Sequence, residues 1–256
     1  MLKHTLLIAK NTFRETMRDR ILLSALVIVF LIIGFSLFVA SISIDQNTRV
    51  IINFSITAIY LLQVFVAIFI GSMLMYKEFE RRTFFLILPK PISLESIIIG
   101  KALGLTATTA VVTGISTFGL WAILLVEGGQ LYILPILYSV IFSILESTLL
   151  ILVSILFSGI TSPILAAIYT LGIYFLGHST EIIRFILAQN TSLVREYALT
   201  FTYYVLPNLE KFNLRNDIIY NNTPTLTISL LTLLYFICYA LVIFLITRIT
   251  LRKKEL

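Results

Sequence analysis

Charged residues, cysteine and histidine are all scarce in this chain of 256 residues, and each shortage excludes a class of protein. Only 12% of the residues are charged, whereas a soluble domain carries about 25% because it must cover its surface with them. The single cysteine, Cys238, excludes an intramolecular disulfide, and its place inside an apolar run argues against a metal or redox role. The composition therefore excludes an ordinary soluble domain and predicts a surface that faces lipid.

Motifs for nucleotide binding and for catalysis inside a membrane are missing from the sequence as well. No G-x-x-x-x-G-K-[ST] pattern occurs, so the chain lacks a Walker-type loop that would hold a phosphate. There is no H-E-x-x-H pattern, the two histidines lie far apart in sequence, and one carboxylate alone, Glu146, lies well inside an apolar run. We therefore predict no catalytic residue, no metal site and no cofactor bound by this chain, and an intramembrane enzyme is the least favoured function.

Long apolar runs are what the sequence has in abundance, since 59% of its residues are hydrophobic and its mean hydropathy is +1.01. A helix of about 20 apolar residues is long enough to cross the hydrocarbon core of a bilayer. The runs predict one all-α polytopic membrane domain over residues 1–256. Its transmembrane helices, about six in number, are expected at 21–41, 50–76, 102–126, 134–157, 163–177 and 226–247. The fifth is short, with Ser162 as its N-cap and Pro163 as its first residue.

Three segments outside these spans have patterns of their own. Residues 1–20 repeat apolar side chains every three or four positions with cations elsewhere, which predicts an interfacial helix in the membrane plane. Residues 77–101 begin with charges, become apolar and are broken by two prolines, which predicts a short cytoplasmic helix, a rigid elbow and a new helix capped by Ser93. Residues 179–224 predict one or two short exoplasmic or re-entrant helices, with a surface loop as the alternative.

The positive charges indicate how the chain is oriented. Fourteen of the 19 Lys and Arg residues lie in the N-terminal arm, in residues 77–101 and in the C-terminal tail. With an even number of spans these three segments share one side, and the positive-inside rule makes that side cytoplasmic. We therefore predict a multi-pass protein of the cytoplasmic (inner) membrane with both termini in the cytoplasm. This distribution accounts for the net charge of +6 without a nucleic-acid partner.

Three segments resemble parts of one protein family. The pattern E-x-E-x-R-T-[FL]-x-x-[LI]-L-x-[KR]-P-I-S…G-K resembles the loop after the second span of ABC-2 type transport permeases. Its matching residues are Glu78, Glu80, Arg82, Thr83, Pro91, Ser93, Gly100 and Lys101. Residues 9–20 are similar to the N-terminal segment of the NosY-like subfamily, and residues 206–212 are similar to a segment before that subfamily's last span. The matches follow the family's order along nearly the whole chain. Two positions depart from the pattern: Leu94, where members often have a basic residue, and Arg82, where glycine commonly precedes the threonine.

The resemblance implies a permease subunit of an ATP-driven transporter, and an exporter. It implies a second copy of the permease, two cytoplasmic ATPase subunits that bind ATP and Mg²⁺, and in some assemblies an accessory extracytoplasmic protein. It also implies a coupling helix that enters a cleft on the ATPase. The predicted coupling residues are Glu78, Phe79, Glu80, Arg81, Arg82, Thr83, Phe84, Phe85 and Pro91. Two alternatives stay open: a loop at residues 77–101 that only fixes topology, and a scaffold or signalling subunit that an ATPase moves without transport.

Polar residues within the apolar runs are candidates for a transport pathway. Glu146 in the fourth span and Gln63 in the second are costly to bury in a membrane, and such residues usually face the interior of the bundle. A structural hydrogen bond to another helix, with the carboxyl of Glu146 protonated, is the alternative. His178, at the end of the fifth span, is expected to be a hydrated interfacial histidine.

The charge asymmetry makes a prediction about topology that cysteine labelling of intact cells can check. In a background without Cys238, cysteines placed at Lys90 and at Lys254 should resist an impermeant thiol reagent, and one placed at Asn213 should react with it. Ready labelling of position 90 from outside would contradict the orientation.

Overall fold

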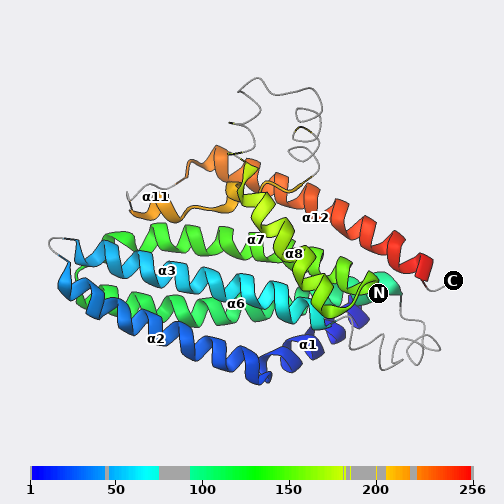
Figure 1. Cartoon of the computed structure of the whole chain (residues 1–256), viewed down its shortest axis with the longest axis horizontal. Helices are drawn as coiled ribbons and strands as arrows, with labels where there is room; N and C mark the ends of the chain where they lie inside the picture. Colours follow the sequence, from blue (N-terminus) through cyan, green and yellow to red (C-terminus); the bar gives the residue numbers. More distant parts are fainter. Residues whose placement is uncertain are drawn as a thin grey trace.

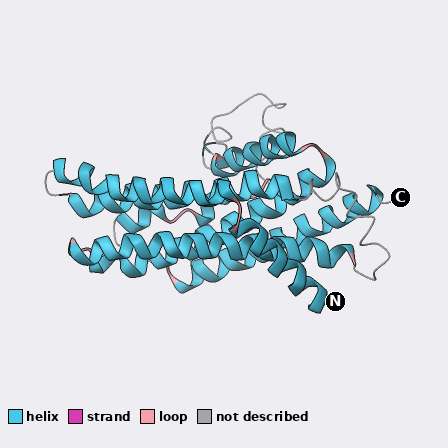
Figure 2. Ribbon diagram, turned by 90° about the horizontal axis from the view of Figure 1, so that it is seen from below, coloured by secondary structure: helices cyan, strands magenta, loops and turns pink. Residues whose placement is uncertain are grey.

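In the computed structural model of the chain, the described residues are 2–43, 46–74, 93–180, 182, 185, 200, 206–219 and 224–254. Within these ranges the regular structure is helical throughout, which confirms the predicted all-α class. The long helices lie side by side in an elongated bundle (Figures 1 and 2). Both termini lie at one end of the bundle, called here the near end. The connections between α2 and α3 and between α6 and α7 lie at the far end (Figure 1).

Five helices in the described ranges are long and apolar enough to cross a membrane, which makes the chain a membrane-embedded helical protein. They are α2 (Arg20–Ile42), α3 with its extension (Asn47–Leu74), α6 (Leu94–Val126), α7 (Ile133–Ile160) with the 3₁₀ turn η2 (Gln130–Tyr132) before it, and α12 (Leu226–Lys254). The sixth predicted span is α8 (Pro163–His178), whose 16 residues extend only ~24 Å. Two short helices, η3 (Leu209–Phe212) and α11 (Arg215–Ile219), precede α12.

Local signals in the sequence set several helix ends. Asp19 caps α2, because its carboxylate accepts a hydrogen bond from the backbone N–H of Ile21 at 2.9 Å. Ser93 caps α6 as predicted, with its hydroxyl accepting from the N–H of Ser96. Pro163 is the first residue of α8, also as predicted. Because the Ser93 cap leads into the third span without a break, α6 begins eight residues before the predicted span.

The bundle is built around α3. In the most apolar stretch of α3 and its extension, 72% of the residues are buried, against 22% in α2 and 17% in α12. The outward faces of α2 and α12 are nonetheless apolar, with large side chains such as Phe38 and Leu231 about 60% exposed. Apolar residues on an outer surface of this kind suit contact with lipid or with another membrane helix.

The N-terminal helix α1 (Leu2–Met17) packs closely along α6, a contact that the expectation of an interfacial helix left open. Thr12 and Thr16 face α6 and are buried. Gly100 and Gly104 of α6 let the two backbones approach, since a Cβ on Gly104 would lie 2.6 Å from the carbonyl oxygen of Ala9. The pattern of apolar and basic residues in the sequence did not indicate that this face of α1 is buried. Leu2 and Leu6 stay exposed on another side of α1, as an interfacial helix requires.

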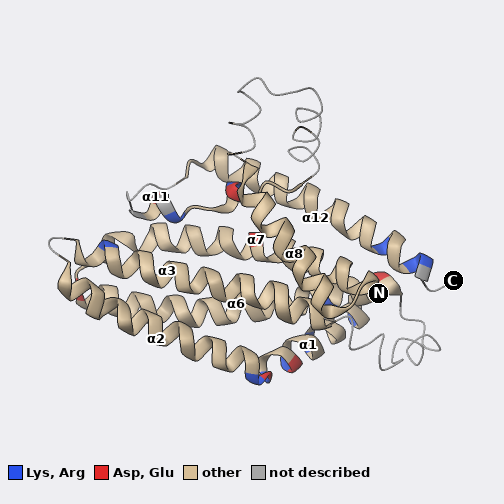
Figure 3. Cartoon of the chain, viewed as in Figure 1, with Lys and Arg blue, Asp and Glu red and all other residues tan. Residues whose placement is uncertain are grey.

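Towards the near end, α3 continues as one turn of π-helix, η1 (Val66–Ile70), and then as α-helix through Leu74, the last described residue of this stretch. The side chain of Lys101, which is 2% exposed, donates a hydrogen bond to the carbonyl oxygen of Leu74 at 3.1 Å. This hydrogen bond ties α6 to the helix that continues α3. Charged side chains also gather at this end (Figure 3), where Arg248 of α12 pairs with Glu95 of α6 at 2.6 Å.

The contact between α1 and α6 can be tested with a matched pair of glycines on α6. Replacing Gly104 by Ala should destabilise the protein by about 1–3 kcal/mol, because the new Cβ would overlap the backbone of α1. A Cβ added at Gly114 would have no atom within 4 Å, so Gly114→Ala should be neutral or stabilising by up to about 1 kcal/mol. The measurement is the free energy of unfolding in mixed micelles. Equal stability of the two variants would contradict the close approach of α1.

Candidate functional site

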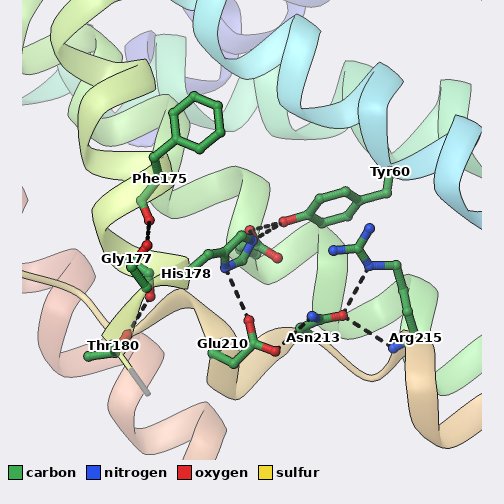
Figure 4. A network of polar contacts seen from close by, with 10 residues as sticks. Tyr60, Phe175, Gly177, His178, Thr180, Glu210, Asn213 and Arg215 are labelled. Atoms are coloured by element: carbon green, nitrogen blue, oxygen red, sulfur yellow. Dashed lines mark hydrogen bonds and ion pairs between the residues drawn. The ribbon is translucent and has the colours of Figure 1, made fainter. Parts of the chain in front are cut away.

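A cluster of polar side chains lies around Glu146, which is 0% exposed. Figure 4 shows its partners Tyr60, His178 and Glu210. Glu146 is about halfway along α7, and Tyr60 is about halfway along the helix that α3 forms with its extension. Both residues are therefore about 20 Å from either end of their helices, at the depth of the middle of a bilayer. His178, the last residue of α8, lies level with Glu146.

Three side chains from three helices share one hydrogen-bonding centre. The Tyr60 hydroxyl donates to Oε1 of Glu146. The same hydroxyl lies 2.5 Å from Nε2 of His178, and that nitrogen lies 3.1 Å from Oε1 of Glu146. Hydrogen bonds of this kind offset the cost of removing a carboxyl group from water.

The contacts continue from His178 into residues 206–219 and return to Tyr60. Nδ1 of His178 lies 3.5 Å from Oε2 of Glu210, and the other Glu210 oxygen accepts a hydrogen bond from Nδ2 of Asn213 at 2.9 Å. Oδ1 of Asn213 accepts from Nε of Arg215 at 3.0 Å and from its backbone N–H at 3.3 Å. The Arg215 guanidinium then stacks over the ring of Tyr60, 4.1 Å from the ring centre. These contacts form a closed circuit, which we call the Glu146 cluster: Tyr60, Glu146, His178, Glu210, Asn213 and Arg215 (Figure 4).

Residues 206–219 come close to the cluster at Gly177, near the end of α8. A Cβ on Gly177 would lie 2.7 Å from Cγ of Leu209 and 2.8 Å from the carbonyl oxygen of Pro207, so only glycine admits this approach. The buried side chains of Leu209, Phe212 and Ile218 then fix the segment against the bundle.

Helix α12 ties down the beginning of the same segment. The Tyr235 hydroxyl accepts a hydrogen bond from the backbone N–H of Asn208 at 2.6 Å. The Tyr239 hydroxyl donates to the carbonyl oxygen of Leu206 at 3.1 Å. The Lys211 ammonium lies over the ring of Tyr235, 4.1 Å from its centre. These contacts satisfy backbone groups of a non-helical stretch that would otherwise be costly at this depth.

The sequence-predicted residues fall into three groups. Glu146 belongs to the cluster. Gln63 is buried but turns to α6, where its Nε2 donates to Oγ1 of Thr113 at 2.9 Å, so it ties α3 to α6. The predicted coupling residues lie outside the described residues: Glu78, Phe79, Glu80, Arg81, Arg82, Thr83, Phe84, Phe85 and Pro91.

The position expected for His178 is wrong. Its side chain is 16% exposed and contacts Glu146, rather than being hydrated at a membrane surface. The contact between His178 and Glu146 could have been predicted from the sequence, because α7 and α8 form an antiparallel hairpin around the turn at Thr161 and Ser162. Glu146 precedes that turn by about as many residues as His178 follows it, so the two come level with each other.

Most of the groups in the cluster are ones that carry charge or bind protons. The cluster combines two carboxyl groups, one guanidinium and one imidazole. Among the described residues, no group of three or more His, Cys, Asp or Glu side chains is arranged to hold a metal ion. Comparison of the chain with models of known protein families and with curated protein sequences finds no match.

The link between Tyr60 and Glu146 can be tested by removing one oxygen. Tyr60→Phe should lower the free energy of unfolding by about 1–3 kcal/mol, because it leaves a buried carboxyl group without its hydroxyl partner. Tyr169→Phe on α8 is the matched control and should change it by less than about 0.5 kcal/mol, because Tyr169 is 45% exposed. The two variants are compared by unfolding in mixed micelles. A Tyr60→Phe variant as stable as the control would show that the hydroxyl does not stabilise the cluster.

Proposed function

We propose that the chain is the membrane-spanning permease subunit of an ATP-driven exporter of the ABC-2 type, resembling the NosY-like subfamily. The observation that carries the proposal is the pattern of residues 78–101, which resembles the segment that couples such permeases to their ATPase. Long apolar helices, including one on each side of this segment, support it. In this proposal the chain is not an enzyme, and ATP and Mg²⁺ bind to two separate cytoplasmic ATPase subunits.

The near end of the bundle is suited to receive force from such a partner. The 33 residues of α6 extend ~50 Å, well beyond the ~30 Å of a hydrocarbon core, so one or both ends of α6 project from it. At its N-terminal end α6 is packed on α1 through Gly100 and Gly104, hydrogen-bonded to the end of α3 through Lys101, and paired with α12 through Glu95. A push on the segment before Ser93 would therefore reach three other helices.

The outward face of α8 supports the proposal of a homodimer with α8 near its axis. Ile164, Ile168 and Phe175 are 74%, 56% and 60% exposed on α8, which crosses one face of the bundle obliquely (Figure 1). An apolar groove of about 440 Å³ between α2 and α3 extends to Leu171 of the same helix. Apolar surface of this extent suits a second membrane protein as well as lipid. In the proposed assembly both termini are cytoplasmic, and an accessory protein could bind at the far end.

The proposal predicts that two aromatic residues anchor the ATPase. Replacing Phe84 and Phe85 together by Ala should weaken ATPase binding about tenfold or more, or uncouple ATP hydrolysis from transport, because aromatic anchors dominate such interfaces. Reversing the charge of Glu80 should have a smaller effect that depends on salt, since charges mainly steer association. The measurement is co-purification of the ATPase with each variant, followed by the ATPase rate in lipid.

Phe35 and Phe38 provide the matched control for this experiment. They form another pair of neighbouring phenylalanines, are 56% and 62% exposed on α2, and are far from residues 77–101 in sequence. Their double Ala variant should bind the ATPase like the parent protein. If the Phe84 and Phe85 variant also binds and couples normally, residues 77–101 only fix topology and the proposed coupling role is wrong.

A further inference from the structure

The charges of the Glu146 cluster do not balance unless it binds a proton. Glu146 and Glu210 contribute two carboxylates, and Arg215 contributes one guanidinium, which stays protonated in proteins. With a neutral His178 the cluster has one negative charge too many. Glu146 is 0% exposed at mid-membrane depth, where an uncompensated charge is costly. One added proton makes the cluster neutral.

The imidazole of His178 is placed to hold that proton. Its Nε2 lies 3.1 Å from Glu146 and its Nδ1 lies 3.5 Å from Glu210, so each ring nitrogen faces a carboxylate. A neutral imidazole carries one N–H and can donate to only one of them, whereas an imidazolium can donate to both. An acceptor on both sides therefore favours the protonated ring, and the contact with Glu210 is then an ion pair.

Four titratable side chains of the described elements contact the His178 ring or lie edge-on to it, and the elements that carry Glu210 and Arg215 also carry Lys211 and Asp217. Tyr60 of α3 contacts Nε2, Glu146 of α7 contacts the same nitrogen, and Glu210 of η3 faces Nδ1. Tyr174, one turn earlier on α8, lies edge-on to the ring at 4.8 Å between centres. Arg215 of α11 lies on the other side, over the Tyr60 ring, and the π-helical turn packed on α8 contributes only apolar side chains.

We propose that the Glu146 cluster is a proton-binding site in which protonated His178 clasps residues 206–219 onto the transmembrane helices. Loss of the proton breaks the ion pair with Glu210 and leaves the charge of Glu146 uncompensated, so the segment separates from α8. The proton exchanges with water at Glu210, whose side chain is 32% exposed, whereas that of Glu146 is 1% exposed. This inference goes beyond the proposed transport function and does not depend on it, because it concerns the permease chain alone.

The protonation state of His178 can be observed directly. The chain has two histidines, so His4→Gln leaves His178 as the only source of imidazole signals. Solid-state ¹⁵N NMR of ¹⁵N-histidine-labelled protein in liposomes should show both ring nitrogens as N–H at about pH 6, and one of them deprotonated at about pH 9. A neutral ring at about pH 6 would overturn the proposal, because the proton would then reside on Glu146 or be absent. An imidazolium that persists at about pH 9 would overturn release by deprotonation.

Release of the segment is measured independently with a nitroxide at the exposed residue Lys211, using Lys211→Cys in a Cys238→Ala background. The ratio of mobile to immobile spin label should rise about tenfold to hundredfold over the pH range in which His178 loses its proton. A tenfold to hundredfold change is the size expected for the loss of one contact between charged groups, here the ion pair of His178 with Glu210. Deprotonation without a change in mobility would overturn the proposal.

Two carboxylate variants separate this mechanism from a general effect of pH. In Glu146→Gln the cluster is neutral without the extra proton, so the pH dependence of spin-label mobility should disappear. Glu127→Gln, at an exposed residue of the α6–α7 turn, should behave like the parent protein. If Glu146→Gln keeps the parent's pH dependence, some other group controls the segment and the proposal is wrong.

Discussion

A carboxyl group in the middle of a membrane helix has to find its partners inside the protein, and Glu146 finds them because α8 is short. A longer α8 would continue past His178, which lies level with Glu146 because both are about equally far from the turn at Thr161 and Ser162. Because α8 ends after 16 residues, its last residue lies level with Glu146 and Tyr60. The space beyond α8 is then filled by residues 206–219, which contribute Glu210, Asn213 and Arg215. The length of one helix thus determines which groups surround the buried carboxyl.

Irregular backbone at this depth needs hydrogen bonds that a membrane cannot supply. Tyr235 and Tyr239 of α12 provide them at the start of the segment, and the side chain of Asn213 bonds Glu210 and the backbone of Arg215 within it. The buried side chains of Leu209 and Phe212 add the apolar contact that keeps water away. The segment is therefore held by the same helices that enclose the cluster, so its position and the charge state of the cluster are linked.

The sequence was sufficient to predict the helical class, most of the spans and the caps at Ser93 and Pro163, because each depends on neighbouring residues. It also identified Glu146 as a buried group that needs partners. It did not predict which partners, because Tyr60, His178 and Glu210 come from helices that tertiary packing brings together. The packing of α1 on α6 was missed for a related reason: small residues such as Gly100, Gly104 and Thr12 carry almost no hydrophobic signal. The coupling residues stay a prediction, since they lie outside the described residues.

The π-helical turn at Val66–Ile70 determines the direction in which the residues that follow it face. A π-helical turn holds one residue more than an α-helical turn, so every side chain and carbonyl after it is rotated by about 100° relative to an uninterrupted α-helix. The carbonyl of Leu74 meets Lys101 only in this rotated phase. Deleting a single residue between Val66 and Ile70 would leave the Tyr60 side of α3 unchanged and turn its last carbonyls away from α6. The extra residue in the π-helical turn thus lets one helix direct Tyr60 towards α7 and the carbonyl of Leu74 towards α6.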